Sequence, residues 1–191
     1  QMNLQTELVE AMLNPITYPE ETGTINLIQT HISFVFLTKE YAYKVKKAVN
    51  FGFLDFSTLE KRCFYCEKEL KLNQRLCPEL YLEVVPINKS NRIMINGAGE
   101  TIDYALKMKR LPQERIMTFL LGENKIDKKV IDEVAAIVAE FHSKTQVNSE
   151  INTYGSLKII KMNWDENFAQ TTKYIQQTIS QNDFDYIQDK I

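Results

Sequence analysis

The sequence is poor in residues that mark several common protein classes. Its 191 residues include six glycines, five prolines, three cysteines, two histidines and one tryptophan. Three cysteines are an odd number and too few for a disulfide framework. Because such a chain suits a reducing compartment, we expect a cytoplasmic protein.

An excess of charge of one sign and long hydrophobic runs are also lacking. Lysine and arginine number 23 against 25 acidic residues, which gives a net charge of -2. No strong overall field therefore favours nucleic acid or an anionic membrane. No apolar run reaches the roughly 18 residues of a membrane span, and the start QMNLQTELVE lacks the pattern of a signal peptide. We expect neither nucleic acid nor a membrane as a partner.

The remaining composition, 44% hydrophobic and 25% charged, is ordinary for a globular protein of one domain or two small lobes. Residues 4–13, LQTELVEAML, predict a helix that ends before Asn14-Pro15. Strands are predicted in residues 25–38, 41–47, 80–87, 91–97 and 101–109, with a turn at Thr38 to Glu40. From residue 112 onwards the patterns are helical, at 112–121, 128–145 and 163–179. This predicts an α+β fold with a strand-rich part before residue 110 and a helical part from 111 to 191.

A long helix is predicted between the two groups of strands. Ser57 and Glu60, in STLE, have the spacing of a capping box, and the helix should end near Cys77-Pro78. Its apolar or small residues alternate in steps of four and three, which indicates a buried stripe. The stripe consists of Leu59, Cys63, Cys66, Leu70 and Cys77, with Asn73 in the remaining position.

A lysine lies on one of the predicted strands. Alternation puts Tyr41, Tyr43 and Val45 on one face, and Ala42, Lys44 and Lys46 on the other. One interpretation is an edge strand with solvated lysines. The other is that Ala42 and Lys44 match the small residue and the lysine of the kinase V-A-I-K strand. There the small residue leaves room for adenine and the lysine neutralises phosphate charge.

Such a lysine needs a carboxylate to hold it, and the long helix offers Glu67 and Glu69. At 100° per residue the two lie on opposite shoulders of the apolar stripe. Geometry alone does not choose between them.

Several segments together resemble a known family. FGFLDFSTLEKR, LNQRL and LYLEVVPI, followed by YALKMKRLP and VAEFHSKT, are similar to the N-terminal part of the aminoglycoside-phosphotransferase-like predicted kinases. Many bacterial members are fused to a P-loop ATP-binding domain. The similarity runs from about residue 8 to about residue 170. It implies a protein-kinase-like N-lobe, an antiparallel sheet plus one long helix, followed by the first helices of a helical C-lobe.

The resemblance also implies a function and roles for particular residues. It implies transfer of the terminal phosphoryl of ATP to a small-molecule hydroxyl, and it favours Glu69 as the partner of Lys44, with Glu67 as the fallback. It places the nucleotide loop at His31 to Ser33, with the Ser33 hydroxyl near phosphate, although no glycine lies between Gly23 and Gly52. The adenine edge would meet the residues Met108, Arg110 and Leu111, with Met108 at the back of the pocket. The alternative for that segment is a strand end running into a helix.

One expected part of the family pattern is missing. No H-G-D-x-x-x-x-N-like catalytic loop follows His142. The resemblance therefore implies an N-terminal fragment, truncated before the catalytic loop and inactive alone, with the ligands of Mg²⁺ outside it. A non-catalytic kinase-like binding or regulatory module is the alternative.

Two further features invite other interpretations. Cys63 and Cys66, in CFYC, could be redox-active or hold half of a zinc site, but they lie inside the predicted helix, where packing cysteines are the favoured interpretation. A stripe is expected in the last predicted helix for lobe packing, and its exposure in a truncated lobe could drive self-association. It consists of Trp164, Phe168, Tyr174 and Ile175.

Overall fold

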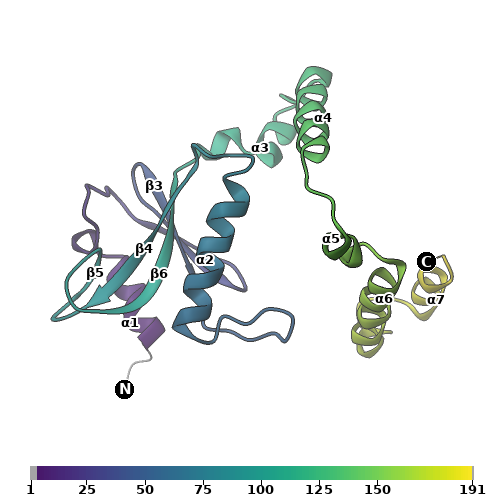
Figure 1. Ribbon diagram of the computed structural model, residues 1–191, viewed down its shortest axis with the longest axis horizontal. Coiled ribbons are helices and arrows are strands. Elements are labelled where there is room, and N and C mark those ends of the chain that lie inside the picture. The colour runs from purple at the N-terminus through teal and green to yellow at the C-terminus, as the bar shows by residue number, and fades with distance from the viewer. Residues whose placement is uncertain (1–3, 191) are drawn as a thin grey trace. The chain divides into compact units, whose positions relative to one another are not determined.

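The computed structural model describes residues 4–190 and has an α+β fold (Figure 1). A curled, antiparallel six-stranded sheet has the order β1-β2-β3-β6-β4-β5. Its strands are β1 (Asn26–Gln29), β2 (Ser33–Leu37), β3 (Tyr41–Lys46), β4 (Tyr81–Lys89), β5 (Ile93–Ile95) and β6 (Glu100–Lys109). The helices are α1 (Leu4–Met12), α2 (Leu59–Asn73), α3 (Met117–Gly122), α4 (Lys128–Ser143), α5 (Ser149–Tyr154), α6 (Leu157–Thr171) and α7 (Gln181–Asp189).

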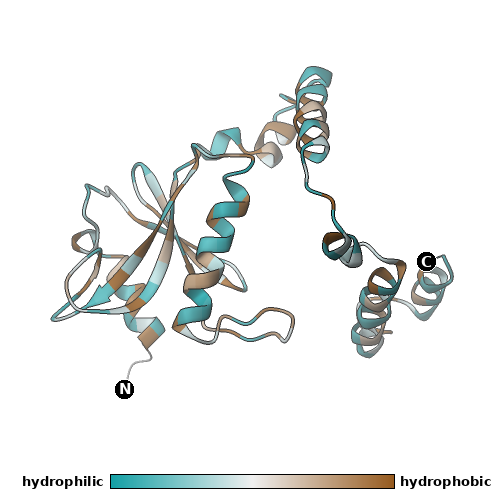
Figure 2. Ribbon diagram, in the orientation of Figure 1, coloured by the Kyte–Doolittle hydropathy of each residue, from teal (hydrophilic) through white to brown (hydrophobic). Residues whose placement is uncertain are grey.

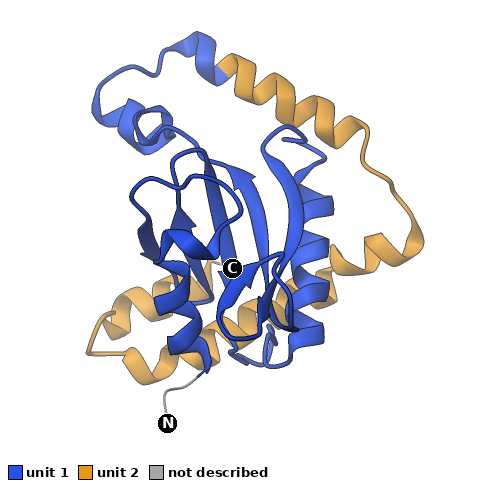
Figure 3. Ribbon diagram, turned by 90° about the vertical axis from the view of Figure 1, so that its left-hand side faces the viewer, with its two compact units in different colours: residues 1–131 blue, residues 132–191 orange. Residues whose placement is uncertain are grey.

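The chain forms two compact units, residues 1–131 and 132–191, which Figure 3 shows in blue and orange. The division falls inside α4, whereas the sequence suggested lobes of residues 1–110 and 111–191. The change from strands to helices does occur where expected. After β6 ends at Lys109, every further element of the described chain is helical, apart from one isolated bridge between Ile175 and Ile179.

The hydrophobic core of the first unit lies between α1 and one face of the sheet. Leu8 and Met12 of α1 pack with Phe36, Tyr43 and Val45, and all five are buried. Figure 2 shows hydrophobic residues in brown along the strands. The predicted alternation of β3 is confirmed, since Tyr43 and Val45 join this core while the other face is left for α2.

The helix α2 begins one residue later than the capping-box prediction. Thr58 is the N-cap, and its hydroxyl accepts from the Lys61 N–H at 3.3 Å. The hydroxyl of Ser57 is engaged elsewhere, because it donates to Asp55 at 2.6 Å. The helix also ends earlier than predicted, at Asn73, so Cys77 lies beyond it and is exposed.

The helical part differs from its prediction in two of the expected segments. Ile116 is extended, with φ -71° and ψ 140°, and splits the segment 112–121 into a short 3-10 turn and α3. The segment 163–179 does not form one helix, because α6 ends at Thr171 and Gln176 has a positive φ of 66°. The expected aromatic stripe is therefore wrong beyond that point. The rings of Trp164 and Phe168 stack on α6, 6.3 Å between centroids, while Tyr174 and Ile175 lie past its end.

Two helices, α5 and α7, were not expected. Trp164 of α6 remains 42% exposed, and self-association through the exposed side chains of α6 stays a prediction. Within residues 4–190, no helix has both the length and the apolar character needed to cross a membrane.

Candidate functional site

The candidate site lies on the face of the sheet that α2 covers, entirely within the first unit. Strand β3 runs between β2 and β6, so it is a central strand and not the edge strand of the simpler interpretation. Its residues Ala42, Lys44 and Lys46 point to the face opposite the core cluster of Tyr43 and Val45. A central strand fixes the backbone on both sides, and this makes β3 a rigid base for a functional lysine.

Glu69 of α2 holds both lysines. Lys44 Nζ lies 2.7 Å from Glu69 Oε1, and Lys46 Nζ lies 2.6 Å from Glu69 Oε2. The structure thus pairs Lys44 with Glu69, as the resemblance implied, while Glu67 is exposed. The side chain of Lys44 is 28% exposed, that of Glu69 is 19% exposed and that of Lys46 is 5% exposed.

The electrostatics of this cluster favour an ionised glutamate. Burial disfavours the charge on Glu69, but the hydrogen bonds from Lys44 and Lys46 outweigh it and hold the pKa of Glu69 below its ordinary value. The site therefore carries two ammonium groups against one carboxylate, a net charge of +1. A half-exposed cation of this kind suits an anionic ligand.

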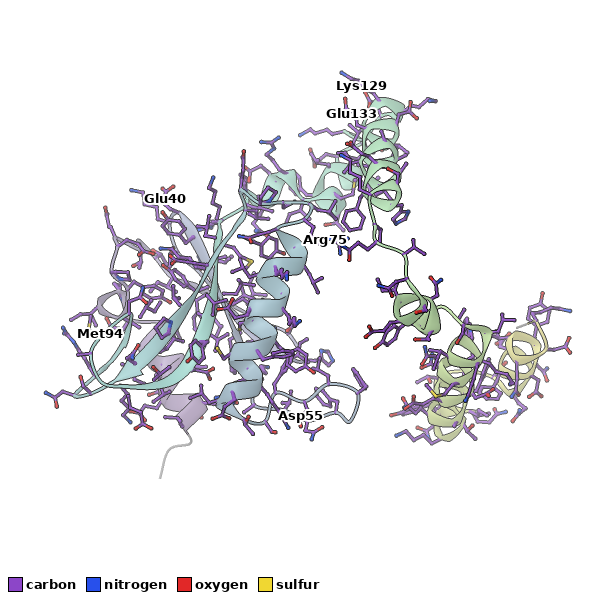
Figure 4. All side chains as sticks on the ribbon, in the orientation of Figure 1. Glu40, Asp55, Arg75, Met94, Lys129 and Glu133 are labelled. Carbon is purple, nitrogen blue, oxygen red and sulfur yellow. The ribbon has the colours of Figure 1, made fainter. Side chains whose placement is uncertain are left out.

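A second, more deeply buried ion pair positions α2 on the sheet. Arg62 lies seven residues before Glu69, and its Nε donates to Asp103 Oδ1 of β6 at 2.9 Å. Arg62 also donates to the carbonyl of Phe56 at 3.2 Å, which ties in the loop before α2. Burial raises the pKa of Asp103 despite the opposing contribution of Arg62. Figure 4 labels Asp55 in that loop and Arg75 just past the end of α2, which bracket the helix.

The end of β6 and the two residues after it are the segment for which the resemblance implied contact with the adenine edge. Ala42, which is buried, is paired with Met108 across the β3–β6 ladder. The backbone N–H groups of Lys109 and Arg110 are already used, by the carbonyls of Leu80 and Glu40 at 2.9 Å each.

The side chain of Arg110 and the backbone of Leu111 differ in whether they can meet a ligand. The guanidinium of Arg110 is engaged, since its Nη1 donates to the Thr38 carbonyl at 2.7 Å. The N–H of Leu111 has no partner within the described part of the chain. Leu111 is thus the residue of this segment whose N–H can donate to a ligand.

The start of β2 fits its predicted role least well. Ser33 is fully buried, and its hydroxyl finds no hydrogen-bond partner among residues 4–190. The Ser33 N–H is used by the Thr30 hydroxyl at 3.0 Å. In this conformation the Ser33 hydroxyl faces the interior, so contact with phosphate would require the β1–β2 turn to move.

Of the two cysteines in CFYC, Cys66 is a buried packing residue and Cys63 is only partly buried. Cys66 is fully buried in α2, and burial raises the pKa of its thiol to about 12. A thiol held protonated in this way is a poor nucleophile and a poor metal ligand. No group of three or more metal-binding side chains occurs among the described residues.

Sequence reasoning missed four contributors to the site. Lys46 was placed on the correct face but given no role, although its spacing of two residues from Lys44 was a visible signal. Arg62 and Asp103 are 41 residues apart, and no local pattern connects them. Tyr81 of β4, paired with Met108, also faces the cluster, and burial together with the charge of Glu69 raises its pKa.

Comparison with known proteins gives relatives but no family. The chain is 27% identical over 156 residues to uncharacterized protein Rv2004c of Mycobacterium tuberculosis (strain H37Rv). The same identity and length relate it to uncharacterized protein MT2060 of M. tuberculosis (strain CDC 1551) and uncharacterized protein Mb2027c of Mycobacterium bovis. Each match covers 82% of this chain and 30% of the relative, so the chain spans less than a third of these proteins. No family model and no solved structure matches the chain.

Proposed function

We propose that this chain is the nucleotide-binding part of an ATP-dependent small-molecule phosphotransferase, with a protein-kinase-like N-terminal lobe followed by the first helices of a second lobe. The observation that carries the proposal is the 2.7 Å ion pair between Lys44 of a central strand and Glu69 of the covering helix. Phosphoryl transfer needs a fixed cation at the phosphates, and a strand lysine held by a helix glutamate is the arrangement that kinases use for it.

Each part of the site has a role in this proposal. The Lys44 ammonium binds phosphate oxygens, and Glu69 holds it in position until the nucleotide arrives. Ala42 leaves space over the sheet for the adenine ring, Met108 lies at the back of that space, and the free N–H of Leu111 donates to the adenine edge. The proposal assigns no residue of this chain as a ligand of Mg²⁺, as a contact of the small-molecule acceptor, or as the group that orients the acceptor hydroxyl.

Equilibrium binding of ATP with Mg²⁺ to the 191-residue chain, measured by calorimetry, tests the proposal. A hydrogen bond to a charged group contributes about 1.5–3 kcal/mol, so Lys44→Met should weaken binding by about 10- to 150-fold.

The matched control is Lys89→Met. Lys89 of β4 forms another lysine–glutamate ion pair between strand and helix, 2.7 Å from Glu7 of α1 and away from the candidate site. ATP binding should survive this change. Equal affinity in wild type and Lys44→Met, or equal losses in both variants, would contradict the proposal.

A second candidate is a kinase-like module that binds nucleotide without catalysis. The inward-facing Ser33 hydroxyl favours this second candidate, because the β1–β2 turn in this conformation offers no hydroxyl to the terminal phosphate of ATP. Both candidates predict nucleotide binding by this chain. Phosphoryl transfer by the longer protein that contains it, assayed with γ-labelled ATP and a panel of hydroxyl acceptors, separates them.

A further inference from the structure

The ion-pair cluster contains one carboxylate and two lysines, and the two lysines do not have equal surroundings. Each ammonium uses a different oxygen of Glu69, Oε1 for Lys44 and Oε2 for Lys46. The two contacts therefore do not compete, and either can be broken while the other remains.

The side chain of Lys46 is almost completely buried among the described residues. Its side chain is 5% exposed, against 28% for Lys44. Its Nζ also lies 4.8 Å from the centroid of the Phe56 ring, a cation–π distance, and Phe56 is itself buried in front of α2. Lys46 has no open path to a ligand, and moving it would separate it from both the carboxylate and the ring.

Lys44 has the opposite character. It has the more exposed of the two ammonium-bearing side chains, and among residues 4–190 no aromatic ring lies over its ammonium as Phe56 does over that of Lys46. If Lys44 were the only partner of Glu69, its movement to a phosphate would leave a largely buried carboxylate without compensation, which is strongly unfavourable. With Lys46 in place, the carboxylate stays paired throughout.

We infer that Lys46 is a positioning residue, the permanent partner of Glu69, and that Lys44 is the exchangeable partner that can leave Glu69 for a phosphate-bearing ligand. The division of roles is a property of the cluster itself. Only the identity of the ligand rests on the proposed function.

Reductive methylation of the wild-type chain with ¹³C-formaldehyde tests the division of roles without any nucleotide. The modified positions are read by tandem mass spectrometry of the peptide that contains Lys44, Lys46 and Lys47. Lys44 should be dimethylated while Lys46 is still unmodified, and Lys46 should react only under denaturing conditions. Methylation of Lys46 as fast as that of Lys44 in the folded chain would overturn the inference.

The effect on Glu69 gives a second, spectroscopic readout. The ¹³C shift of its carboxyl, followed against pH, should show a larger upward shift of the Glu69 pKa in Lys46→Met than in Lys44→Met, and Lys46→Arg should restore the low value. The other titratable groups facing Glu69 are Tyr81 and Cys66, whose raised pKa values keep them neutral over this range. Equal shifts in both methionine variants would contradict the separate roles. If Lys46→Met does not fold, the order in which Lys44 and Lys46 are methylated in the wild-type chain still tests the two roles, as does the Glu69 pKa in Lys46→Arg.

ATP added during labelling separates this inference from the proposed function. Protection of Lys44 alone, with Lys46 unchanged, supports both. Protection of neither lysine would refute ATP as the ligand, while the labelling order without nucleotide would still establish or refute the roles of the two lysines. Protection of Lys46 but not Lys44 would overturn the inference.

Discussion

Removing the charge of Asp103 should loosen the helix that carries Glu69. Asp103 is 2% exposed and Arg62 is 7% exposed, so Asp103→Asn would leave the Arg62 guanidinium buried without its counter-ion. Loss of one partner of a buried pair typically costs about 3–5 kcal/mol of folding free energy. For a unit of roughly 130 residues, that is a large part of the total stability of about 5–15 kcal/mol.

The neighbouring residue of α2 provides the control. Lys61 pairs with Asp55 at the surface, with side chains 45% and 27% exposed. Exposed ion pairs contribute about 0–1 kcal/mol, so Lys61→Met should barely change stability. The double variant Arg62→Leu with Asp103→Leu should recover much of the loss, because it removes both buried charges together.

Urea unfolding followed by tyrosine near-ultraviolet circular dichroism measures these changes. Tyr18 and Tyr43 are buried in the core of the unit that contains Asp103, whereas Trp164 lies in residues 132–191 and does not report on this core. A loss below about 1 kcal/mol for Asp103→Asn, no larger than that of Lys61→Met, would refute a structural role for the buried pair.

Two further predictions concern pH and cysteine chemistry. Because the pKa of Glu69 is lowered in the fold, its ionised form stabilises the protein above the unfolded-state pKa of about 4.5, and this stabilisation is lost as pH falls through the lower folded pKa. The difference in melting temperature between wild type and Glu69→Gln should therefore be constant near neutral pH and shrink below about pH 5. A difference that grows on acidification would contradict the lowered pKa. Glu67→Gln, at an exposed position of the same helix, is the control variant. Cys66, buried with a pKa of about 12, should resist a thiol reagent at pH 8 until urea unfolds the chain. Exposed Cys77 should react at once and serves as the control. Rapid labelling of Cys66 in the folded protein would show that α2 is not packed as described.

The parts of the fold that follow from local patterns were predictable. Period-two alternation placed Tyr43 and Val45 on one face and Lys44 on the other, because a strand allows no other arrangement of neighbouring side chains, and the structure shows that the first face is the core. The capping box was misplaced by one residue, since Ser57 and Thr58 are chemically similar and only the contact between Ser57 and Asp55 distinguishes them.

Features set by long-range contacts were not predictable. The buried pair of Arg62 and Asp103 depends on how α2 crosses β6, and neither residue stands out in its own segment. Lys46 looked like one more solvated lysine, because its burial depends on the Phe56 ring and on Glu69, which come from a distant loop and helix. The expected helix over residues 163–179 failed at Thr171 although its apolar spacing continued, which shows that spacing alone does not fix where a helix ends.

The most direct test of the central claim asks whether an ATP-like molecule places its phosphates at Lys44. Fluorosulfonylbenzoyl adenosine carries a lysine-reactive group where the phosphates of ATP would lie. Incubated with the chain and mapped by mass spectrometry, it should modify Lys44, and excess ATP should prevent the reaction. Modification spread over exposed lysines such as Lys109 and Lys128, or modification of Lys44 that ATP does not reduce, would contradict a nucleotide site at this ion pair.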